Sequence, residues 1–495
     1  MTTAPSAPTP DLLDRLRELL GPRGVLTEPA DVAPYVSDWT GVFVGTAAAV
    51  LRPADTAQVA AAVTACAAAG VAVVPQGGNT GLAGGSVPDA SGQQVVLVLD
   101  RMRRVREVDP VADTITVEAG VVLATVQQEA AAAGRLFPLS LGSEGSCTVG
   151  GTVSTNAGGT AVLRYGMMRD LVLGLEVVLP DGRVWDGLRP LRKDNTGYDL
   201  KQLFIGAEGT LGIVTAAVLR MLPDTPRRAT ALLALPSVDA AVALLPVLRE
   251  HGGGELTAWE LLSRQALELV TTHLPGARDP FEGPHPWYGL VELAGSADSV
   301  GERLEEALAA AVEQDLVADA VLAGSPAQRA ALWALREGVS EVQKSEGPSL
   351  KHDVTLPIAT LAGFVAQVGP ELEQVLPGVR LVTYGHVGDG NLHYNLSGPV
   401  DDPLALRAAA PALTRTVYDA VAALGGSISA EHGLGALKRD AAAGYKSEVE
   451  VDLMHALKAA LDPRGLLNPG KVLAPRPGGG PATTATTSSR GPSAS

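Results

Sequence analysis

The spacing of hydrophobic residues predicts alternating short helices and strands in the first half of the chain. Residues 11–21, DLLDRLRELLG, carry leucines at helical spacing and end on a glycine. Between Val50 and Leu222, five apolar runs have the length and composition of strands: VAVVP, VVLVLD, TITVEAG, GLEVVLPDGRVW and LGIVTAAVLRML. The fourth run contains a Pro-Asp-Gly turn and so predicts a β-hairpin. Together these elements predict an α+β domain with many glycine loops.

A second pattern begins after PDTPRR, residues 223–228, which is typical of a linker. Helices are expected near residues 301–313 and around Trp333. Strands are expected in TALLALPS, WYGLVELAG, LKHDVTLPI and the paired run LVTYGHVGDGNLHYNLSG. This order predicts an antiparallel sheet covered by helices on one face, which would form a cap domain. A final helix in EVDLMHALKAALDP leads into RGLLNPGKVL.

These patterns divide the chain into five parts. A leader with one helix is expected over residues 1–29, the first domain over 30–225 and the cap over 226–430. Residues 431–475 are expected to return to the first domain as a C-terminal helical segment. Residues 476–495 are rich in Gly, Pro, Ser and Thr, a composition that predicts disorder.

Composition and charge exclude several classes of function. A length of 495 residues exceeds one ordinary hydrophobic core. The 38 basic and 54 acidic residues give a net charge of −16 without a long basic run, which argues against nucleic-acid binding. The 2 cysteines allow no disulfide framework, as in a reducing compartment. The N-terminus does not resemble a signal peptide, and the apolar run at residues 59–75 is too short to span a membrane. We therefore expect a cytoplasmic protein, at most peripheral to a membrane, and leave a homodimer open.

Residues 381–398, LVTYGHVGDGNLHYNLSG, carry the first candidate chemistry. Asp389 and Gly390 favour a two-residue hairpin turn, which would place His386 directly opposite His393. Opposed side chains on a hairpin have Cβ atoms roughly 4.5–5.5 Å apart, close enough to share one metal ion. Two half-buried strand histidines bonded to the backbone are the alternative at this point.

Three glycine-rich loops suggest a long cofactor. PQGGNTGLAGG lacks the G-x-G-x-x-G order of a Rossmann site, and GLLNPGKV has Val472 where a P-loop needs a hydroxyl. Loops at residues 75–81, 141–159 and 206–214 combine glycine with small hydroxyl residues. Glycine lets backbone N–H groups approach phosphates closely, so three such loops favour a cofactor that contains a pyrophosphate.

These loops resemble those of the vanillyl-alcohol-oxidase-type (PCMH) FAD-binding domain. GHVGDGNLH, SAEHGLG and LDPRGLLNPGK resemble the D-2-hydroxyacid dehydrogenase branch, which includes D-2-hydroxyglutarate and D-lactate dehydrogenases. The resemblance spans about residues 30 to 473 and implies FAD between the two domains. Asn79 and Thr80 occupy the region where relatives with covalent flavin often have a histidine, so non-covalent FAD is expected. The implied FAD contacts are Pro75, Gly77, Gly78, Asn79, Thr80, Gly81, Leu141, Gly142, Thr148, Gly151, Ser154, Asn156, Gly158, Ile213 and Asn468.

Oxidation of a 2-hydroxy acid also needs a metal or other Lewis acid, a base and a carboxylate clamp. Glu431 is the candidate third ligand beside His386 and His393, a set that suits Zn²⁺, Mn²⁺ or Fe²⁺. The neighbouring His432 is the candidate base. The resemblance implies that Arg336 and Lys351 hold substrate carboxylates and that Ser340 and Asn391 add hydrogen bonds. His352 and His285 are expected to be exposed and without function.

The expected function is oxidation of a D-2-hydroxy acid, with D-2-hydroxyglutarate favoured because a second carboxylate would use a second cation. D-lactate and glycolate are the alternatives within the class. A non-catalytic FAD-binding subunit and an oxidase that reduces oxygen are the alternatives outside it. The expected electron acceptor is a quinone, a cytochrome or an electron-transfer flavoprotein.

Overall fold

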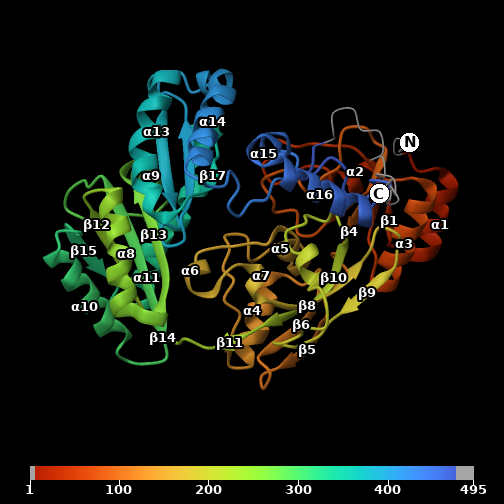
Figure 1. The fold of residues 1–495 in the computed structure, drawn as a ribbon, viewed down its shortest axis with the longest axis horizontal. Coiled ribbons are helices and arrows are strands. Elements are labelled where there is room, and N and C mark those ends of the chain that lie inside the picture. The colour runs from red at the N-terminus through yellow and green to blue at the C-terminus, as the bar shows by residue number, and fades with distance from the viewer. Residues whose placement is uncertain (1–5, 475–495) are drawn as a thin grey trace, which may run out of the picture.

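A computed structural model describes residues 6–474 and arranges them in two lobes (Figure 1). The first lobe contains the N-terminal half of the chain together with the last two helices. The middle of the chain forms the second lobe, which corresponds to the predicted cap. The predicted disordered tail, residues 476–495, lies outside the described residues, as do residues 1–5.

The first lobe begins with a four-stranded sheet in the order β1-β2-β4-β3. β2, β4 and β3 are parallel, and β1 joins β2 antiparallel. The helix that follows β2 buries Val59, Val63 and Cys66 against this sheet, as expected for a surface helix before a buried strand. The elements are α1 (Pro10–Leu20), β1 (Val25–Leu26), α2 (Pro29–Val32), β2 (Ala47–Leu51), α3 (Thr56–Ala69), β3 (Val73–Gln76) and β4 (Gln94–Val98).

A five-stranded antiparallel sheet completes the first lobe, in the order β5-β6-β10-β8-β9. The predicted hairpin is confirmed, because β8 and β9 pair across the Pro-Asp-Gly turn. The elements are β5 (Val105–Asp109), β6 (Thr114–Glu118), α4 (Leu123–Ala132), β7 (Arg135–Leu136), α5 (Val149–Thr155), α6 (Val162–Tyr165), α7 (Met168–Leu171), β8 (Val172–Val178), β9 (Val184–Gly187), β10 (Ile213–Arg220) and β11 (Leu222–Pro223).

The cap contains an eight-stranded sheet in which all pairs are antiparallel, as predicted. Its order is β15-β12-β14-β13-β18-β19-β16, and β17 also pairs with β19. The strands are β12 (Arg227–Leu235), β13 (Leu256–Ser263), β14 (Trp287–Gly295), β15 (Asp319–Leu322), β16 (Ser349–Leu350), β17 (Asp353–Thr355), β18 (Arg380–Gly385) and β19 (Asn391–Ser397). The helices are α8 (Val238–Gly252), α9 (Arg264–His273), α10 (Val300–Glu313), α11 (Pro326–Glu337), α12 (Val339–Val342), α13 (Leu361–Val375) and α14 (Ala405–Ala423).

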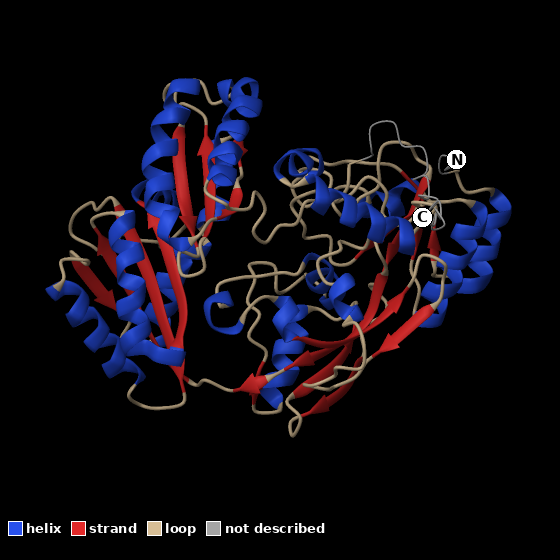
Figure 2. Ribbon diagram, viewed as in Figure 1, coloured by secondary structure: helices blue, strands red, loops and turns tan. Residues whose placement is uncertain are grey.

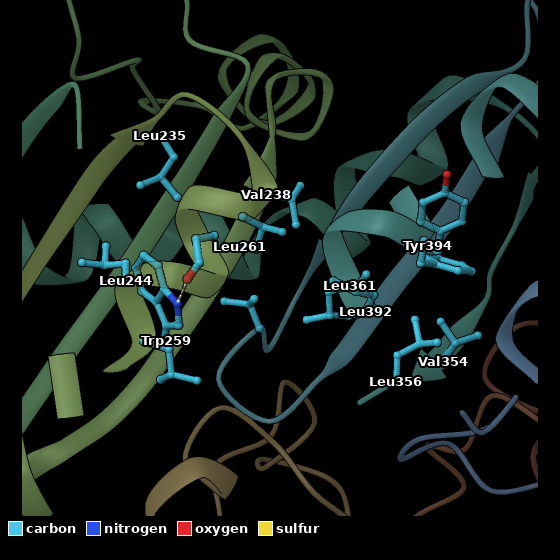
Figure 3. Packing of buried hydrophobic residues seen from close by; sticks show 14 of the residues in the cluster. Leu235, Val238, Leu244, Trp259, Leu261, Val354, Leu356, Leu361, Leu392 and Tyr394 are labelled. Carbon is cyan, nitrogen blue, oxygen red and sulfur yellow. Dashed lines mark hydrogen bonds between the residues drawn. The ribbon is translucent and has the colours of Figure 1, made fainter. Parts of the chain in front are cut away.

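Helices cover both faces of the cap sheet, so the expectation of one covered face was wrong (Figure 2). The strands are apolar on both sides: Leu233 and Leu235 face α8 and α10, whereas Leu232 and Ala234 face α9 and α11. Figure 3 shows the first of these cores, where Trp259 donates a hydrogen bond to the Ala241 carbonyl. A strand with two apolar faces must be covered twice, and this determines the layered cap.

The C-terminal segment returns to the first lobe. α15 (Arg439–Tyr445) and α16 (Glu448–Leu461) lie over it in Figure 1. Leu467 pairs with Val73 as a parallel bridge, and the Lys458 ammonium donates to the Thr210 carbonyl. The last part of the chain thereby completes the first sheet. Within residues 6–474, none of the helices combines the length and apolar composition needed to cross a bilayer.

His352 is buried, with 2% of its surface exposed, so the expectation of an exposed residue was wrong. It lies between the two short strands β16 and β17, and its ring nitrogens lie 3.0 Å from the Tyr394 carbonyl oxygen and 3.1 Å from Thr414 Oγ1. Burial lowers the pKa of His352 to about 4. The imidazole is therefore neutral in the folded protein at pH values where it would be charged in the unfolded chain.

This depressed pKa predicts acid sensitivity. In the unfolded chain His352 titrates near 6.5, so its contribution to stability is complete above that pH and is lost as pH falls toward 4. Between pH 7 and pH 5 the loss should be roughly 2 kcal/mol in the free energy of unfolding. His352→Asn should reduce the pH dependence of urea unfolding by that amount. Equal pH dependence in His352→Asn and the wild type would contradict the assignment.

Candidate active site

A cavity of about 610 Å³ lies between the two lobes and is lined by residues from both. The first lobe contributes the three glycine-rich loops, and the cap contributes Ser340, Lys344, Glu431 and His432. Nearly all residues expected to contact FAD line this cavity. They are Pro75, Gly77, Gly78, Asn79, Thr80, Gly81, Leu141, Gly142, Thr148, Gly151, Ser154, Gly158 and Ile213.

The walls of this cavity fit a cofactor with a phosphate backbone. A Cβ on Gly77 would lie 2.5 Å from Thr148 Oγ1, and one on Gly78 would lie 2.2 Å from the Ser146 carbonyl oxygen. Glycine is therefore required for the two loops to approach each other. Thr148 Oγ1 is buried and has no hydrogen-bond partner among the described residues. A buried hydroxyl without a partner at the cavity wall is a donor available to a bound ligand.

Asn156 and Asn468, also expected to contact FAD, do not line the cavity. Asn156 ends α5 in a left-handed conformation with φ 50°, and its Oδ1 accepts from the Arg169 backbone N–H. Asn468 is buried, and its amide nitrogen donates to the carbonyl oxygens of Gly85 and Glu208. In this structure both residues therefore hold the loops around the cavity.

The turn between β18 and β19 differs from the predicted one. His393 pairs with Tyr384, two residues from the expected partner His386. The backbone N–H groups of Asp389, Gly390 and Asn391 all point at the His386 carbonyl, which makes a longer turn. A two-residue turn needs φ > 0 at both central positions, and here Gly390 (φ 89°) meets that condition but Asp389 does not. The His386 and His393 rings still lie 5.6 Å apart.

Four side chains gather with one candidate ligand atom each, and two of them, Glu431 and His432, line the cavity. These atoms, from Asp353, His393, Glu431 and His432, all lie within 4.8 Å of one another. Glu431 Oε1 lies 3.6 Å from His393 Nε2 and 3.8 Å from His432 Nε2. Two ligands of one tetrahedral Zn²⁺ are about 3.4 Å apart, so these separations fit a shared divalent ion. The donor set of imidazoles and a carboxylate suits the same ions.

Asp353 was not predicted, although it lies in the LKHDVTLPI run. Its Oδ2 accepts hydrogen bonds from the backbone N–H groups of residues 430, 431 and 432, and its Oδ1 accepts from the Asn391 amide. The side chain is 1% exposed. With these four hydrogen bonds, Asp353 is suited to hold the loop that carries Glu431 and His432.

Glu260 was also missed. It is a buried carboxylate in the apolar strand β13, and its Oε1 lies 2.7 Å from His386 Nδ1. Its Oε2 accepts from Arg336 Nε at 2.6 Å. A charged residue in an apolar strand is the one sequence signal that could have identified it.

The buried charges shift the two histidines in opposite directions. Burial alone would lower the pKa of His386, but the Glu260 carboxylate raises it to about 9. Burial dominates at His393, and its pKa lies well below the usual value. A neutral imidazole is the form that binds a metal, so His393 is already in that form.

The expected substrate-binding residues differ in their position relative to the cavity. Ser340 lines the cavity. The Arg336 guanidinium lies 4.9 Å over the Tyr384 ring and is buried. Lys351 is half-buried, and burial and the nearby Lys344 lower its pKa. The Asn391 amide nitrogen donates to Asp353 and to the Val354 carbonyl, so it supports the site from behind.

Glu208 lines the cavity and was not named from the sequence, although its loop was. It has φ 50°, and its carboxylate accepts from the backbone N–H groups of Leu434 and Gly435. Burial raises its pKa. Glu208 thereby ties a cavity loop of the first lobe to the loop that follows His432.

The glycine cradle gives a test of cofactor binding. In Gly78→Ala the new Cβ would overlap the Ser146 carbonyl and push apart two loops that line the cavity, so bound FAD should fall at least tenfold. FAD per chain after gel filtration measures this. Gly145→Ala is the matched control, because a Cβ there meets no atom within 4 Å. Full FAD content in Gly78→Ala would contradict the location of the cofactor.

Comparisons with known proteins agree with this architecture. Residues 47–187 match the family described as "FAD binding domain", and residues 225–472 match "FAD linked oxidases, C-terminal domain". The crystal structure of p-cresol methylhydroxylase superimposes with a TM-score of 0.73 at 19% identity, covering 93% of this chain and 96% of that one. At this identity the likeness shows the fold alone.

Two curated relatives are more similar in sequence. The D-2-hydroxyglutarate dehydrogenase of Xanthomonas citri pv. viticola is 39% identical over 447 residues, covering 90% of this chain and 93% of that protein. A Schizosaccharomyces pombe protein, named as a candidate mitochondrial D-lactate dehydrogenase, is 39% identical over 458 residues, covering 90% and 86%. The chain therefore belongs to the vanillyl-alcohol-oxidase-type family of FAD-linked D-2-hydroxyacid dehydrogenases.

Proposed function

We propose that this protein oxidises a D-2-hydroxy acid to the 2-oxo acid with FAD and a divalent metal ion, and that D-2-hydroxyglutarate is the substrate. One observation carries the proposal: a single cavity is lined by the glycine loops of the first lobe and by Glu431 and His432 of the cap. Groups suited to a flavin and groups suited to a metal thus face the same space. The relative from Xanthomonas citri supports the choice of substrate.

The metal ligands in this proposal are His386, His393 and Glu431. The hydrogen bond from His386 Nδ1 to Glu260 supports the choice of His386, because this bond leaves Nε2 available for an ion. Asp353 is set aside as a ligand because its four hydrogen bonds give it another role, which is to hold the loop that carries Glu431 and His432. When bound, FAD would supply the hydride acceptor and the metal, Zn²⁺ or else Mn²⁺ or Fe²⁺, would supply a Lewis acid for the hydroxyl.

His432 is the proposed base that removes the hydroxyl proton. Its Nδ1 lies 3.6 Å from Asp353 Oδ2, and its ring lines the cavity. A carboxylate behind Nδ1 favours the proton on that nitrogen, so Nε2 is left to accept the substrate proton. His432 as a fourth metal ligand is the alternative, because its Nε2 lies 3.8 Å from Glu431 Oε1.

Three cations of the cap support a dicarboxylate substrate, and of these Lys344 lines the cavity. Arg336 uses Nε for Glu260, which leaves its Nη groups for the substrate carboxylate next to the hydroxyl. Lys351 and its neighbour Lys344 would serve the second carboxylate, and a bound carboxylate would relieve the repulsion between these two ammonium groups. Ser340 would add a hydrogen bond from the cavity wall.

D-lactate or glycolate is the second candidate substrate. The Schizosaccharomyces pombe relative supports this alternative. Both acids offer one carboxylate and would leave the second cation without a partner. The electron acceptor, a homodimer and a cytoplasmic location stay predictions. The name of the Schizosaccharomyces pombe relative describes that protein as mitochondrial.

Anaerobic titration of the purified flavoprotein tests the proposal. D-2-hydroxyglutarate should bleach the flavin absorbance and its L-isomer should not, and chelation should abolish the reaction. D-lactate should act at a KM at least tenfold higher because it lacks the second carboxylate. Bleaching by neither isomer of either acid would contradict the proposed reaction. Reduced flavin that is reoxidised by air with stoichiometric peroxide would favour an oxidase.

Variants separate the proposed roles of the histidines. His386→Ala and His393→Ala should each lose bound metal and turnover while keeping yellow FAD, because each removes one of three ligands. His432→Asn should keep metal and FAD but reduce flavin at least a hundredfold more slowly. His285→Ala is the control for loss of a histidine outside the cavity. Loss of metal in His432→Asn would instead favour the alternative in which His432 is a ligand.

A further inference from the structure

We infer that Glu260 is a positioning residue that joins the metal site to the carboxylate clamp. One carboxylate contacts both groups: Oε1 lies 2.7 Å from His386 Nδ1, and Oε2 accepts from Arg336 Nε at 2.6 Å. This inference rests on the proposed function, in which His386 is a metal ligand and Arg336 binds the substrate. It adds a residue that does not itself contact substrate or metal.

The location of Glu260 makes both contacts rigid. The residue is 1% exposed and lies in the middle of β13, a strand whose eight residues are all buried. β13 is the inner neighbour of β18, which leads directly into His386. Removing water from a carboxylate is costly unless its oxygens are paired, and here the imidazole and the guanidinium provide that pairing.

Each contact fixes one property of the site. The bond to Nδ1 sets the orientation of the His386 ring and directs Nε2 away from β13, as carboxylates do behind many metal-bound histidines. The bond to Nε fixes the plane of the Arg336 guanidinium, which also lies 4.9 Å over the Tyr384 ring. A fixed guanidinium loses less entropy when its Nη groups bind a carboxylate. Both effects depend on the same side chain.

A second buried glutamate on the next strand provides a comparison, because its contacts serve only to hold the structure together. Glu292 in β14 is 2% exposed and contacts Arg329 of α11, Arg228 and the Trp333 indole N–H. Arg329 and Arg336 are on the same helix, so both glutamates anchor α11 to the sheet. Only Glu260 of this pair also contacts a histidine, the proposed metal ligand His386. Its contact with His386 therefore goes beyond docking of α11.

The experiment compares Glu260→Gln with Glu292→Gln. Each substitution removes one buried charge that pairs with an arginine of α11 and keeps the shape of the side chain. FAD-bound protein is cleared of metal by chelation, and Zn²⁺ affinity is measured by competition with a chromophoric chelator. Glu260→Gln should bind Zn²⁺ about 10- to 100-fold more weakly, the usual effect of losing a carboxylate behind a metal-bound histidine. Its KM for D-2-hydroxyglutarate, measured at saturating Zn²⁺, should rise at least tenfold.

Glu292→Gln should lower the urea midpoint but leave Zn²⁺ affinity and KM within twofold of the wild type. Unchanged Zn²⁺ affinity in Glu260→Gln, or equal losses in both variants, would overturn the inference. If Glu260→Gln does not fold, Glu260→Asp takes its place, because it keeps the charge but shortens the reach. Weaker Zn²⁺ binding in a folded Glu260→Asp supports the inference, and wild-type affinity overturns it. A wild-type protein that binds no Zn²⁺, Mn²⁺ or Fe²⁺ would instead refute the proposed metal site itself.

Discussion

The Asp353 carboxylate determines where the loop of Glu431 and His432 lies relative to the cavity. Three consecutive backbone N–H groups, from residues 430 to 432, converge on one oxygen of this side chain. The strand that carries Asp353, β17, is itself held between β19 and the bridge from Thr355 to Ser427. An irregular loop has no ladder of its own hydrogen bonds, so a buried carboxylate supplies the fixed reference that a strand would otherwise give.

A buried carboxylate needs several partners that stabilise its negative charge, and the residues around Asp353 provide them. Burial alone would raise the pKa of Asp353, but the nearby His432 and Lys438, together with backbone N–H groups, hold it well below its usual range. Lys438 also donates to the carbonyl of Ile428, so the same cation contacts both Asp353 and the segment that leads into Glu431. Asn391, the first residue of β19, contributes through its side-chain amide. The polar residues around the cavity thus form one connected group, in which the removal of any member leaves another charge or dipole unpaired.

Much of the fold follows from local sequence, and the exceptions have physical causes. The hairpin of β8 and β9 and the strand Trp287–Gly295 were predictable because their apolar runs and turns are local signals. The second helical layer on the cap was missed because the order of strands and helices does not say on which face of the sheet each helix packs, although strands such as Arg227–Leu235 are apolar on both faces. The register between β18 and β19 was wrong because Asp-Gly favours a short turn, whereas the His386 carbonyl collects three N–H groups in a longer one.

The candidate site was predictable where residues act through motifs and was missed where they act through tertiary contacts. Most of the glycine-loop residues line the cavity, and His393, Glu431 and His432 gather with Asp353, whereas His386 is not part of that group. Asp353 and Glu260 were overlooked because their partners lie 38 to 126 residues away in sequence. His352 was misjudged because burial of a lone histidine depends on Tyr394 and Thr414, which no spacing in the sequence relates to it.

The bridge between Val73 and Leu467 has a consequence for how the protein is made. During translation, the two segments of the first lobe are synthesised separately, with the entire cap between them. During synthesis, the sheet that contains β3 waits for its last partner with part of its edge uncovered, and domains that emerge early normally fold as units. The nascent first lobe must therefore persist as an unfinished intermediate until residue 467 emerges, and that interval is when it is most exposed to aggregation and to proteases.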